Sequence, residues 1–366
     1  MARRHLMLGA VVALSLAAAA CGSDATSATS STAGTGESAF PAERCDANRE
    51  AGTVKFLTSF NYAAAASIID VVAADAQGYF EAVCLDVELE PGFSTANVAA
   101  VAANQAQMTS LGSFSEVAVA NAADADLVAV AVEGQTAVET LLVEKGKGIS
   151  KLADLEGHKI GIKGAIPFSV RAMLAKAGVD ESTLTQIEVD FNPITLFETE
   201  IDALPAYKSN EPRQLDDNGY EGKYDTFDPA DEDIPASFAV FTTSRGFAQE
   251  HPSAVADFLR AALKGFEWAA EHQEEAVALS LKLGDPELFF SPESETFRWA
   301  TESELVRSST PSGEAIGTID PARLEAEVRT LEELGVIDEG AVDAKAAYDT
   351  SFMDEITKDG ALVWLS

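Results

Sequence analysis

Basic residues are scarce in this sequence of 366 residues: 25 lysines and arginines stand against 60 aspartates and glutamates, and the formal net charge is −35. No block rich in lysine or arginine interrupts this excess of acid. Because nucleic acids are bound through basic side chains that neutralise phosphates, the composition excludes a nucleic acid as a partner. The hydrophobic fraction of 47% is too high for an acidic disordered chain, so a folded core is expected.

Long apolar runs are also scarce, and the clearest one covers residues 6–20. This run is shorter than the roughly 20 residues that span a bilayer. Arg3 and Arg4 precede it, and Cys21 follows its closing alanines, which resembles a bacterial lipoprotein signal. We therefore predict a signal peptide over residues 1–20 and a lipid on Cys21. The alternative is ordinary signal cleavage nearby.

The segment after Cys21 lacks large apolar side chains. Residues 22–40 are mainly serine, threonine, glycine and alanine, which cannot offset the entropy lost on ordering. We predict that residues 21–50 form a flexible tether, which holds the folded body at the outer face of the cell membrane. No basic face is evident in the sequence, so the lipid would be the anchor.

Cysteine is rare, and only Cys45 and Cys84 follow Cys21. Outside the cytoplasm, an even pair of cysteines is more often bridged than free. We predict a disulfide between Cys45 and Cys84, with two separately buried thiols as the alternative.

The body of the chain alternates between strand and helix patterns. Strands are predicted at residues 54–57, 87–90, 108–111, 127–132, 159–162, 188–191, 203–207 and 238–241. Helices are predicted at residues 63–79, 95–104, 116–122, 169–176 and 194–200, and almost throughout the chain after residue 241. Pro252, Pro292 and Pro321 lie where later helices would begin. The repeated βαβ order predicts an α/β protein with mainly parallel sheets and helices on both faces.

Ligands of open α/β sheets bind beside the carboxyl ends of the strands. The segments that follow predicted strands are residues 58–62, 111–115, 164–168 and 207–212. The sequence has no nucleophile elbow, P-loop or clustered metal ligands, and its acidic stretch at residues 225–233 lacks the pattern of an EF-hand. We therefore predict a solvated acidic loop there, and no catalytic residue, metal site or cofactor.

Five segments carry a family resemblance. They are GYFEAVCLDVELEPG (residues 78–92), LADLEGHKIGIKG (152–164), IDALPAYKSNEPRQL (201–215), HPSAVADFLRAALKGFEWAAEHQEEAV (251–277) and AIGTIDPARLEAEVRTLEELGVI (315–337). In this order and spacing they resemble the thiamine-pyrimidine-precursor-like group of substrate-binding lipoproteins of ABC transporters. That group is related to sulfonate, taurine and nitrate binders, and the resemblance covers residues 53–337.

The resemblance implies a type II periplasmic-binding-protein fold, with two α/β lobes joined by a hinge and a helical C-terminal region packed on them. The first lobe would comprise residues 51–142 and 246–366, and the second lobe residues 143–245. The chain would be an extracytoplasmic monomer that passes a small ligand to an ABC permease and its ATPase.

In the family, the Asn210-Glu211-Pro212 region forms the ligand side of the second lobe. Glu211 would accept hydrogen bonds from an amine or a ring N–H, and Asn210 offers both a donor and an acceptor. The alternative is a helix start, with Asn210 as its cap and Glu211 in its first turn.

The other candidate ligand-binding residues come from the post-strand segments. Phe60, Phe168 and Tyr207 offer aromatic faces to a planar ring, with a place in the core as the alternative. Ser113 offers a hydroxyl to an anion or a ring acceptor, or it caps a helix. The same segments also contribute Asn61 and Phe114.

Three hypotheses for the function follow. The first is a transport protein whose lobes close on a planar, nitrogen-bearing ligand, with sulfonate and riboflavin as alternative ligands. The second is an enzyme related to a pyrimidine synthase that consumes its own histidine. The predicted mature chain has only His158, His251 and His272, and it lacks that enzyme's cysteine-rich motif. The third hypothesis is an extracellular sensor or adhesion module without a permease.

Overall fold

The computed structural model describes residues 40–284 and 291–365. All of them belong to one compact unit, Ser38–Ser366. The predicted signal peptide, the acylated Cys21 and residues 21–39 of the predicted tether lie outside the described residues. Within the described part, no helix has both the length and the apolar character needed to cross a membrane.

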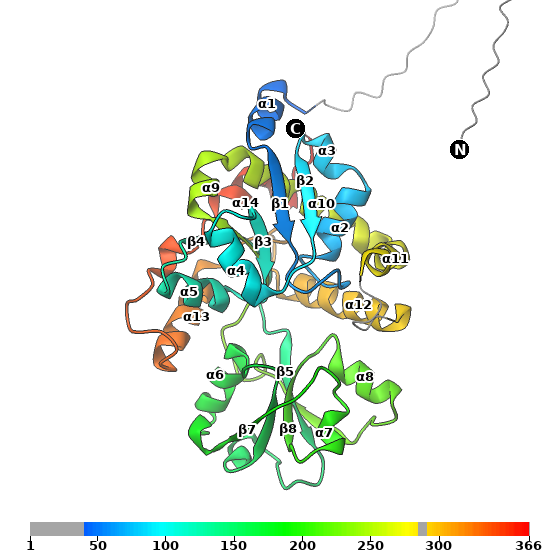
Figure 1. Ribbon diagram of the computed structural model, residues 1–366, viewed down its shortest axis with the longest axis vertical. Coiled ribbons are helices and arrows are strands. Elements are labelled where there is room, and N and C mark those ends of the chain that lie inside the picture. The colour runs from blue at the N-terminus through cyan, green and yellow to red at the C-terminus, as the bar shows by residue number, and fades with distance from the viewer. Residues whose placement is uncertain (1–39, 285–290, 366) are drawn as a thin grey trace, which may run out of the picture. The chain divides into compact units, whose positions relative to one another are not determined.

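The first sheet gathers strands from separate parts of the chain (Figure 1). In the described ranges its strand order is β2-β1-β3-β10-β4. The bounds are Thr53–Leu57 (β1), Asp86–Glu90 (β2), Met108–Leu111 (β3), Leu127–Gly134 (β4) and Phe238–Ser244 (β10). β1 is parallel to β2 and β3, whereas β10 is antiparallel to β3 and β4. The sheet is therefore mixed rather than mainly parallel, because β10 returns to it from the second sheet.

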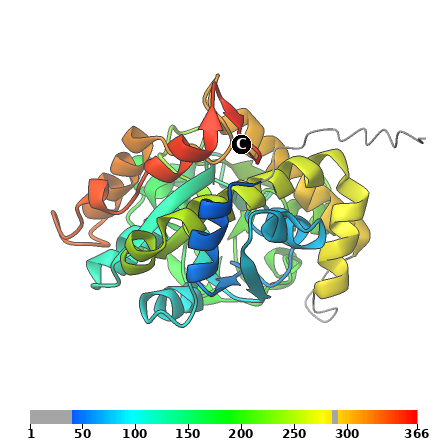
Figure 2. The same cartoon turned by 90° about the horizontal axis from the view of Figure 1, so that it is seen from above.

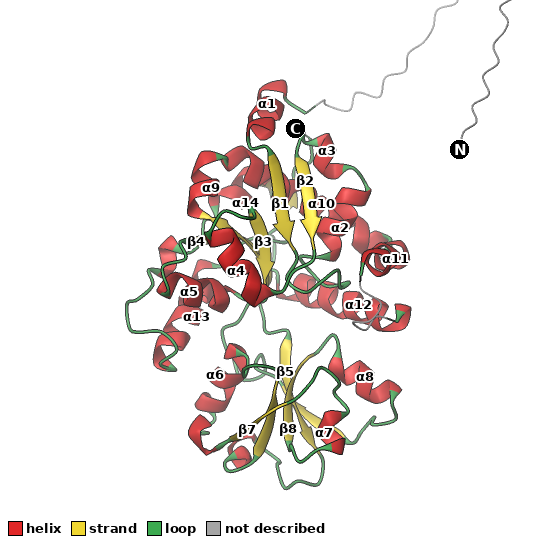
Figure 3. Cartoon of the chain, viewed as in Figure 1, coloured by secondary structure: helices red, strands yellow, loops and turns green. Residues whose placement is uncertain are grey.

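The second sheet comes from the middle of the chain (Figure 3), in the order β7-β6-β8-β5-β9. Its strands are Glu139–Glu144 (β5), Lys159–Ile162 (β6), Thr185–Glu188 (β7), Ala203–Tyr207 (β8) and Tyr224–Phe227 (β9). β6 is parallel to β7 and β8, and β5 is antiparallel to β8 and β9. We call the part built on the first sheet the first lobe, and the part built on the second sheet the second lobe.

Sheet membership corrects the expected lobe boundaries. The boundary at residues 142/143 cuts through β5, which pairs with β8 in the second sheet. Residues 238–244 were expected in the second lobe, but they form β10 of the first sheet. The chain crosses between the lobes over residues 135–138 and 228–237.

Most helices belong to the first lobe. They are Ala42–Glu50 (α1), Ile69–Ala76 (α2), Tyr79–Ala82 (α3), Ser94–Ala102 (α4), Phe114–Ala122 (α5), Arg245–Glu250 (α9), Pro252–Glu271 (α10), Gln273–Leu283 (α11), Pro292–Ser309 (α12), Pro321–Glu333 (α13) and Ser351–Ile356 (α14). The second lobe carries Phe168–Lys176 (α6), Thr195–Glu198 (α7) and Glu211–Asp217 (α8). The predicted helix starts at Pro252, Pro292 and Pro321 are confirmed.

The structure differs from the sequence prediction at five places. The helix expected over residues 63–79 begins only at Ile69, and residues 63–68 form a loop. Within the sequence expected as a strand at residues 188–191, only Glu188 is strand, because β7 lies three residues earlier. β5 was not predicted, and part of the expected acidic loop is strand β9. The region after residue 244 is mainly helical, but it also contains a short hairpin in which Thr357–Lys358 (β11) pairs with Ala361–Leu362 (β12).

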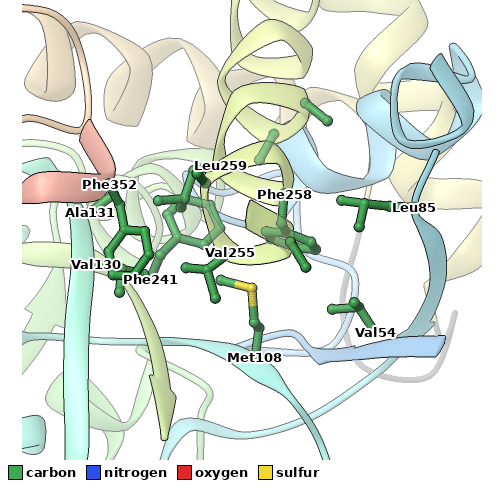
Figure 4. Packing of buried hydrophobic residues seen from close by; sticks show 14 of the residues in the cluster. Val54, Leu85, Met108, Val130, Ala131, Phe241, Val255, Phe258, Leu259 and Phe352 are labelled. Atoms are coloured by element: carbon green, nitrogen blue, oxygen red, sulfur yellow. The ribbon is translucent and has the colours of Figure 1, made fainter. Parts of the chain in front are cut away.

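Helix α10 supplies the centre of the first lobe's core (Figure 4). The ring of Phe258 stacks on Phe56 of β1, with ring centroids 5.2 Å apart, and on Phe80 of α3 at 5.0 Å. Phe241 of β10 meets Phe258 edge-on. Burying aromatic side chains contributes strongly to stability. A helix from the last third of the chain therefore holds the N-terminal strands in place.

Helix α1 corrects the tether prediction for residues 42–50. Figure 2 shows α1 in dark blue beside the yellow-green helices, and it contacts α10. Cys45 of α1 and Cys84 form a disulfide, with Cα atoms 5.2 Å apart. Asn48 is fully buried and donates a hydrogen bond of 2.8 Å to Asp257 of α10. The last nine residues of the expected tether are thus part of the folded body.

We predict that Gly265→Ala destabilises the first lobe. A Cβ atom on Gly265 of α10 would lie 2.0 Å from the carbonyl oxygen of Asp70 on α2, so the two helices would have to move apart. The free energy of unfolding in urea should fall by about 1–3 kcal/mol. Gly246→Ala is the control, because no atom lies closer than 4.0 Å to the added Cβ in α9. A wild-type midpoint for Gly265→Ala would contradict the close approach.

Candidate functional site

Two adjoining cavities lie between residues of the first and second lobes, and we call them together the cleft. Their volumes are about 160 Å³ and 290 Å³. The smaller is lined by Phe60, Glu139, Lys163, Ala165, Pro167, Phe191, Pro205, Ala206, Tyr207, Asn210, Glu211 and Arg298. The larger shares four of these residues, namely Phe60, Phe191, Tyr207 and Arg298, and extends over residues 65–68, 93–95, 111–112 and 238–239 of the first lobe.

Aromatic rings dominate the apolar part of the cleft. Phe60 follows β1, and its ring meets Phe93 edge-on at 5.5 Å and Phe191 of the second lobe at 6.4 Å. Phe93, Phe191 and Tyr207 are 48%, 60% and 43% exposed. In the described ranges only Leu283 joins them as an exposed large hydrophobic residue. Exposed apolar surface is thus gathered where both lobes face the same space.

The loop at residues 63–68 forms the first-lobe floor of the larger cavity. Its backbone N–H groups donate to three buried carboxylates, which belong to β4 and α12. Ala64 donates to Glu295 at 2.7 Å, Ala66 to Glu302 at 2.8 Å and Ser67 to Glu133 at 2.8 Å. These bonds replace the intrahelical bonds that the run of alanines would otherwise make. The loop is therefore held by residues remote in sequence.

Helix α12 also reaches the second lobe. Arg298 forms an ion pair with Glu295 at 3.1 Å and donates to the side-chain oxygen of Asn210 at 2.9 Å. Glu302 accepts a hydrogen bond of 2.6 Å from the Ser209 hydroxyl. Burial is the main cause of the raised pKa of Glu302, and the nearby Arg298 opposes it. Side chains of α12 thus contact the turn before α8 directly.

Glu211 lies in the cleft at the first position of α8, as expected for a residue of the second-lobe wall. It is 3% exposed, accepts a hydrogen bond of 2.8 Å from the Tyr207 N–H and forms an ion pair with Lys163. Lys163 also lies over the Phe191 ring, 5.8 Å from its centroid. Asn210 lines the cleft too, but its side chain makes no capping bond to α8. One carboxylate oxygen of Glu211 is thus engaged by Lys163.

Tyr207 has the most acidic surroundings in the cleft. Although the side chain is partly exposed in the cleft, the protein packed around it raises the pKa of Tyr207 well above the usual value, and the nearby carboxylates of Glu139, Glu116, Glu211 and Glu302 raise it further. Its phenol is therefore neutral over the physiological range and can act as a hydrogen-bond donor. The cleft combines aromatic faces with an excess of carboxylates.

Four expected residues do not line the cleft. Phe114 is fully buried in the first lobe's core, and Asn61 is 5% exposed with a positive φ of 45°. Ser113 and Phe168 instead line a separate cavity of about 20 Å³, beside the second crossing between the lobes. The post-strand pattern places these residues near strand ends but does not show which way their side chains point.

Sequence reasoning missed several residues of the cleft. Phe93 follows the predicted second strand, so the rule that selected Phe60 applies to it as well. Lys163 and Phe191 also come at or after predicted strands. Arg298 and Glu302 lie in the middle of α12, and no signal in the sequence marks them.

Comparison with known proteins shows the family. Residues 65–276, more than half of the chain, match the family described as NMT1/THI5 like. The chain therefore belongs to the NMT1/THI5-like family, in agreement with the expected resemblance.

Two curated relatives are similar to parts of the chain. The formylaminopyrimidine-binding protein of Halalkalibacterium halodurans is 27% identical over 210 residues, which cover 56% of this chain and 63% of that protein. The riboflavin-binding protein RibY of Chloroflexus aurantiacus is 28% identical over 171 residues, covering 44% and 45%. The chain thus spans less than two thirds of the length of either relative.

Solved structures confirm the type II periplasmic-binding-protein fold. The periplasmic aliphatic sulphonate binding protein SsuA from Escherichia coli has a TM-score of 0.60 at 16% identity, covering 81% of this chain and 91% of that chain. The desulfurization enzyme DSZB has a TM-score of 0.55 at 13% identity, covering 82% and 98%. The fold therefore serves both binding proteins and an enzyme, so function has to be argued from the cleft.

Proposed function

We propose that the chain is the extracytoplasmic solute-binding component of an ABC importer and captures a small planar heteroaromatic ligand that contains nitrogen. The observation that carries this proposal is the group of exposed rings in the cleft, Phe93, Phe191 and Tyr207. Exposure of aromatic rings to water is unfavourable. A ligand ring stacked between them removes this surface from water, which favours binding. The relative that binds formylaminopyrimidine supports a ligand of the thiamine-pyrimidine-precursor type.

Capture would proceed by closure of the lobes around the ligand. Phe60 and Phe93 belong to the first lobe and Phe191 and Tyr207 to the second, so a ligand between them binds the closed arrangement better than an open one. Residues 135–138 and 228–237 cross between the lobes and would bend. The closed form would then deliver its ligand to the permease and ATPase, with the lipid on Cys21 keeping it at the membrane.

The proposal includes no chemical step. The histidines of the described chain, His158, His251 and His272, line neither cavity of the cleft. His158 instead lies 3.0 Å from Asp202 in the second lobe. A reaction that consumes an active-site histidine therefore has no candidate residue among those that face the cleft.

A panel of ligands tests the proposal by thermal unfolding. Hydroxymethylpyrimidine or formylaminopyrimidine should raise the Tm, and at about 100 times Kd the stabilisation should reach about 2.7 kcal/mol. Phe191→Leu should reduce this shift, because it removes a ring from the cleft wall. Phe197→Leu is the matched control in the same lobe, since Phe197 stacks on Tyr220 outside the cleft.

The panel also contains riboflavin and alkylsulfonates. A shift with taurine alone would reject the aminopyrimidine ligand and favour a sulfonate, and a shift with riboflavin alone would favour the larger ring system. If no member of the panel raises the Tm, the proposal of a planar heteroaromatic ligand is wrong.

A further inference from the structure

The charges that line the cleft are unbalanced. Four carboxylates face it, from Glu116, Glu139, Glu211 and Glu302. The cationic side chains in the described lining are Lys163 and Arg298, and both already contact a carboxylate: Lys163 that of Glu211, and Arg298 that of Glu295. Since Glu295 lies outside the lining, the space offered to a ligand is acidic.

Glu116 differs from the other carboxylates of the cleft. Glu302 uses both of its oxygens, for the Ala66 N–H and the Ser209 hydroxyl, and Glu139 accepts from the Ser169 hydroxyl. In contrast, Oε2 of Glu116 is buried and has no hydrogen-bond partner among the described residues. Glu116 lies in the first turn of α5 and lines the larger cavity, and the Ser94 hydroxyl and the backbone N–H groups of Gly112 and Ser113 lie near its carboxylate. An unpartnered carboxylate oxygen beside the cavity gains a hydrogen bond if a ligand donor reaches it.

We propose that Glu116 selects for positive charge, so that the planar ligand enters the cleft as a cation, such as an amidinium or a protonated aminopyrimidine. This inference rests on the proposed function and names the charge of its ligand. An N–H⁺ group at Glu116 would complete a charge-assisted hydrogen bond, which is about twice as strong as a neutral one. A sulfonate in the same position would meet repulsion in a site withdrawn from water.

Protonation of Glu116 gives the inference a measurable signature. Burial raises the pKa of Glu116 to about 7, and repulsion from Glu139 of β5 contributes. Tyr207 of β8, together with Glu302 and Arg298 of α12, also faces the larger cavity. A bound cation favours the ionised form of Glu116, so binding below pH 7 releases a proton. Affinity for a permanent cation should therefore fall by about tenfold for each pH unit below 7.

Three probes of similar size separate the effect of charge from that of shape. Benzamidine is a cation at every pH used, benzamide is neutral and benzenesulfonate is an anion. We expect calorimetry at pH 8 to give at least about tenfold tighter binding for benzamidine than for benzamide, and no binding of benzenesulfonate. At pH 6, benzamidine should bind more weakly than at pH 8 and release protons to the buffer, whereas benzamide should do neither.

Glu116→Gln tests the residue itself. The variant should lose about tenfold in affinity for benzamidine at pH 8, lose the proton release at pH 6 and retain its affinity for benzamide. Asp124→Asn is the control, because it removes an exposed carboxylate of the same lobe at a positive φ of 63°, which asparagine tolerates.

Several results would overturn the charge selection. They are equal binding of benzamide and benzamidine, tighter binding of benzenesulfonate, no binding of any probe, or proton release that survives in Glu116→Gln. None of these results decides the proposed function, which is tested separately by the ligand panel in thermal unfolding. A pyrimidine that raises the Tm without a preference for charge would reject this inference alone.

Discussion

At pH 8, replacing Glu133 by glutamine is expected to raise the free energy of unfolding by about 3 kcal/mol and to flatten the dependence of stability on pH. Glu133 of β4 and Asp70 of α2 are fully buried and interact through their carboxyl groups. Burial raises the pKa of Asp70 to about 7. Burial is also the main cause of the raised pKa of Glu133, followed by repulsion from Asp70.

The sign of the pH dependence follows from these raised pKa values. In the unfolded chain both carboxyl groups lose their protons near pH 4, whereas the folded protein keeps them to about pH 7 or above. Between about pH 4 and pH 7, the free energy of unfolding is therefore greatest at the acidic end. It falls as the pH rises towards 7 and beyond. Each extra proton held by the folded state gives a slope of about 1.4 kcal/mol per pH unit.

Glutamine at position 133 preserves the local hydrogen bonding. Its amide oxygen can accept from the Ser67 N–H, which donates to Glu133 at 2.8 Å, and its amide N–H can donate to the ionised Asp70. Urea denaturation from pH 5 to pH 8 would measure the slope. Glu304→Gln, on the exposed face of α12, should leave it unchanged. If Glu133→Gln keeps the wild-type slope, or is less stable than the wild type at pH 8, the buried pair is not the source of the pH dependence of stability.

Most parallel strands could be predicted closely because their sequences are short apolar runs between polar residues. The exception is β7 at the edge of the second sheet, which lies three residues before its predicted position. β3, β6 and β8 lie where the pattern placed them, and β1 begins one residue earlier. β9 could not be recognised, because its edge position leaves Asp225 and Thr226 exposed, and its pairing with β5 is not visible locally. A strand defined by its partner rather than by its own apolar run is invisible in one sequence.

The loop at residues 63–68 shows the same limit for helices. Alanine has the highest helix propensity, and the run therefore predicted a helix. The residues that accept its N–H groups are 231 positions away at Glu295, 236 at Glu302 and 66 at Glu133. Local propensity is overridden by tertiary contacts that no window of sequence contains.

The candidate site was predictable where it follows strands. The post-strand rule and the family resemblance selected Phe60, Tyr207, Asn210 and Glu211, and all four line the cleft. The roles of these residues in binding remain a prediction. The rule could not find Arg298, because a basic residue in the middle of a helix follows no strand and has the pattern of an exposed residue whether or not it is buried.

Replacing Arg298 by methionine is expected to lower the free energy of unfolding by about 3–5 kcal/mol at pH 8, the usual cost of removing one partner of a buried ion pair. The side chains of Arg298 and Glu295 are 4% and 1% exposed, so water cannot replace the lost guanidinium. The substitution also removes the positive charge that opposes the raised pKa of Glu302 on the same helix. Methionine retains the unbranched apolar stem of the side chain, which limits the loss of packing to a smaller effect.

Two further variants separate the lost charge from altered packing. Arg307→Met removes an exposed arginine from α12 and should change the free energy of unfolding by less than about 1 kcal/mol. Glu295→Gln in the Arg298→Met background should restore much of the lost stability, because glutamine is neutral and still accepts from the Ala64 N–H. Urea midpoints measure both effects. If the double variant is no more stable than Arg298→Met alone, an uncompensated carboxylate is not the cause, and the role of Arg298 in holding the cleft is one of packing.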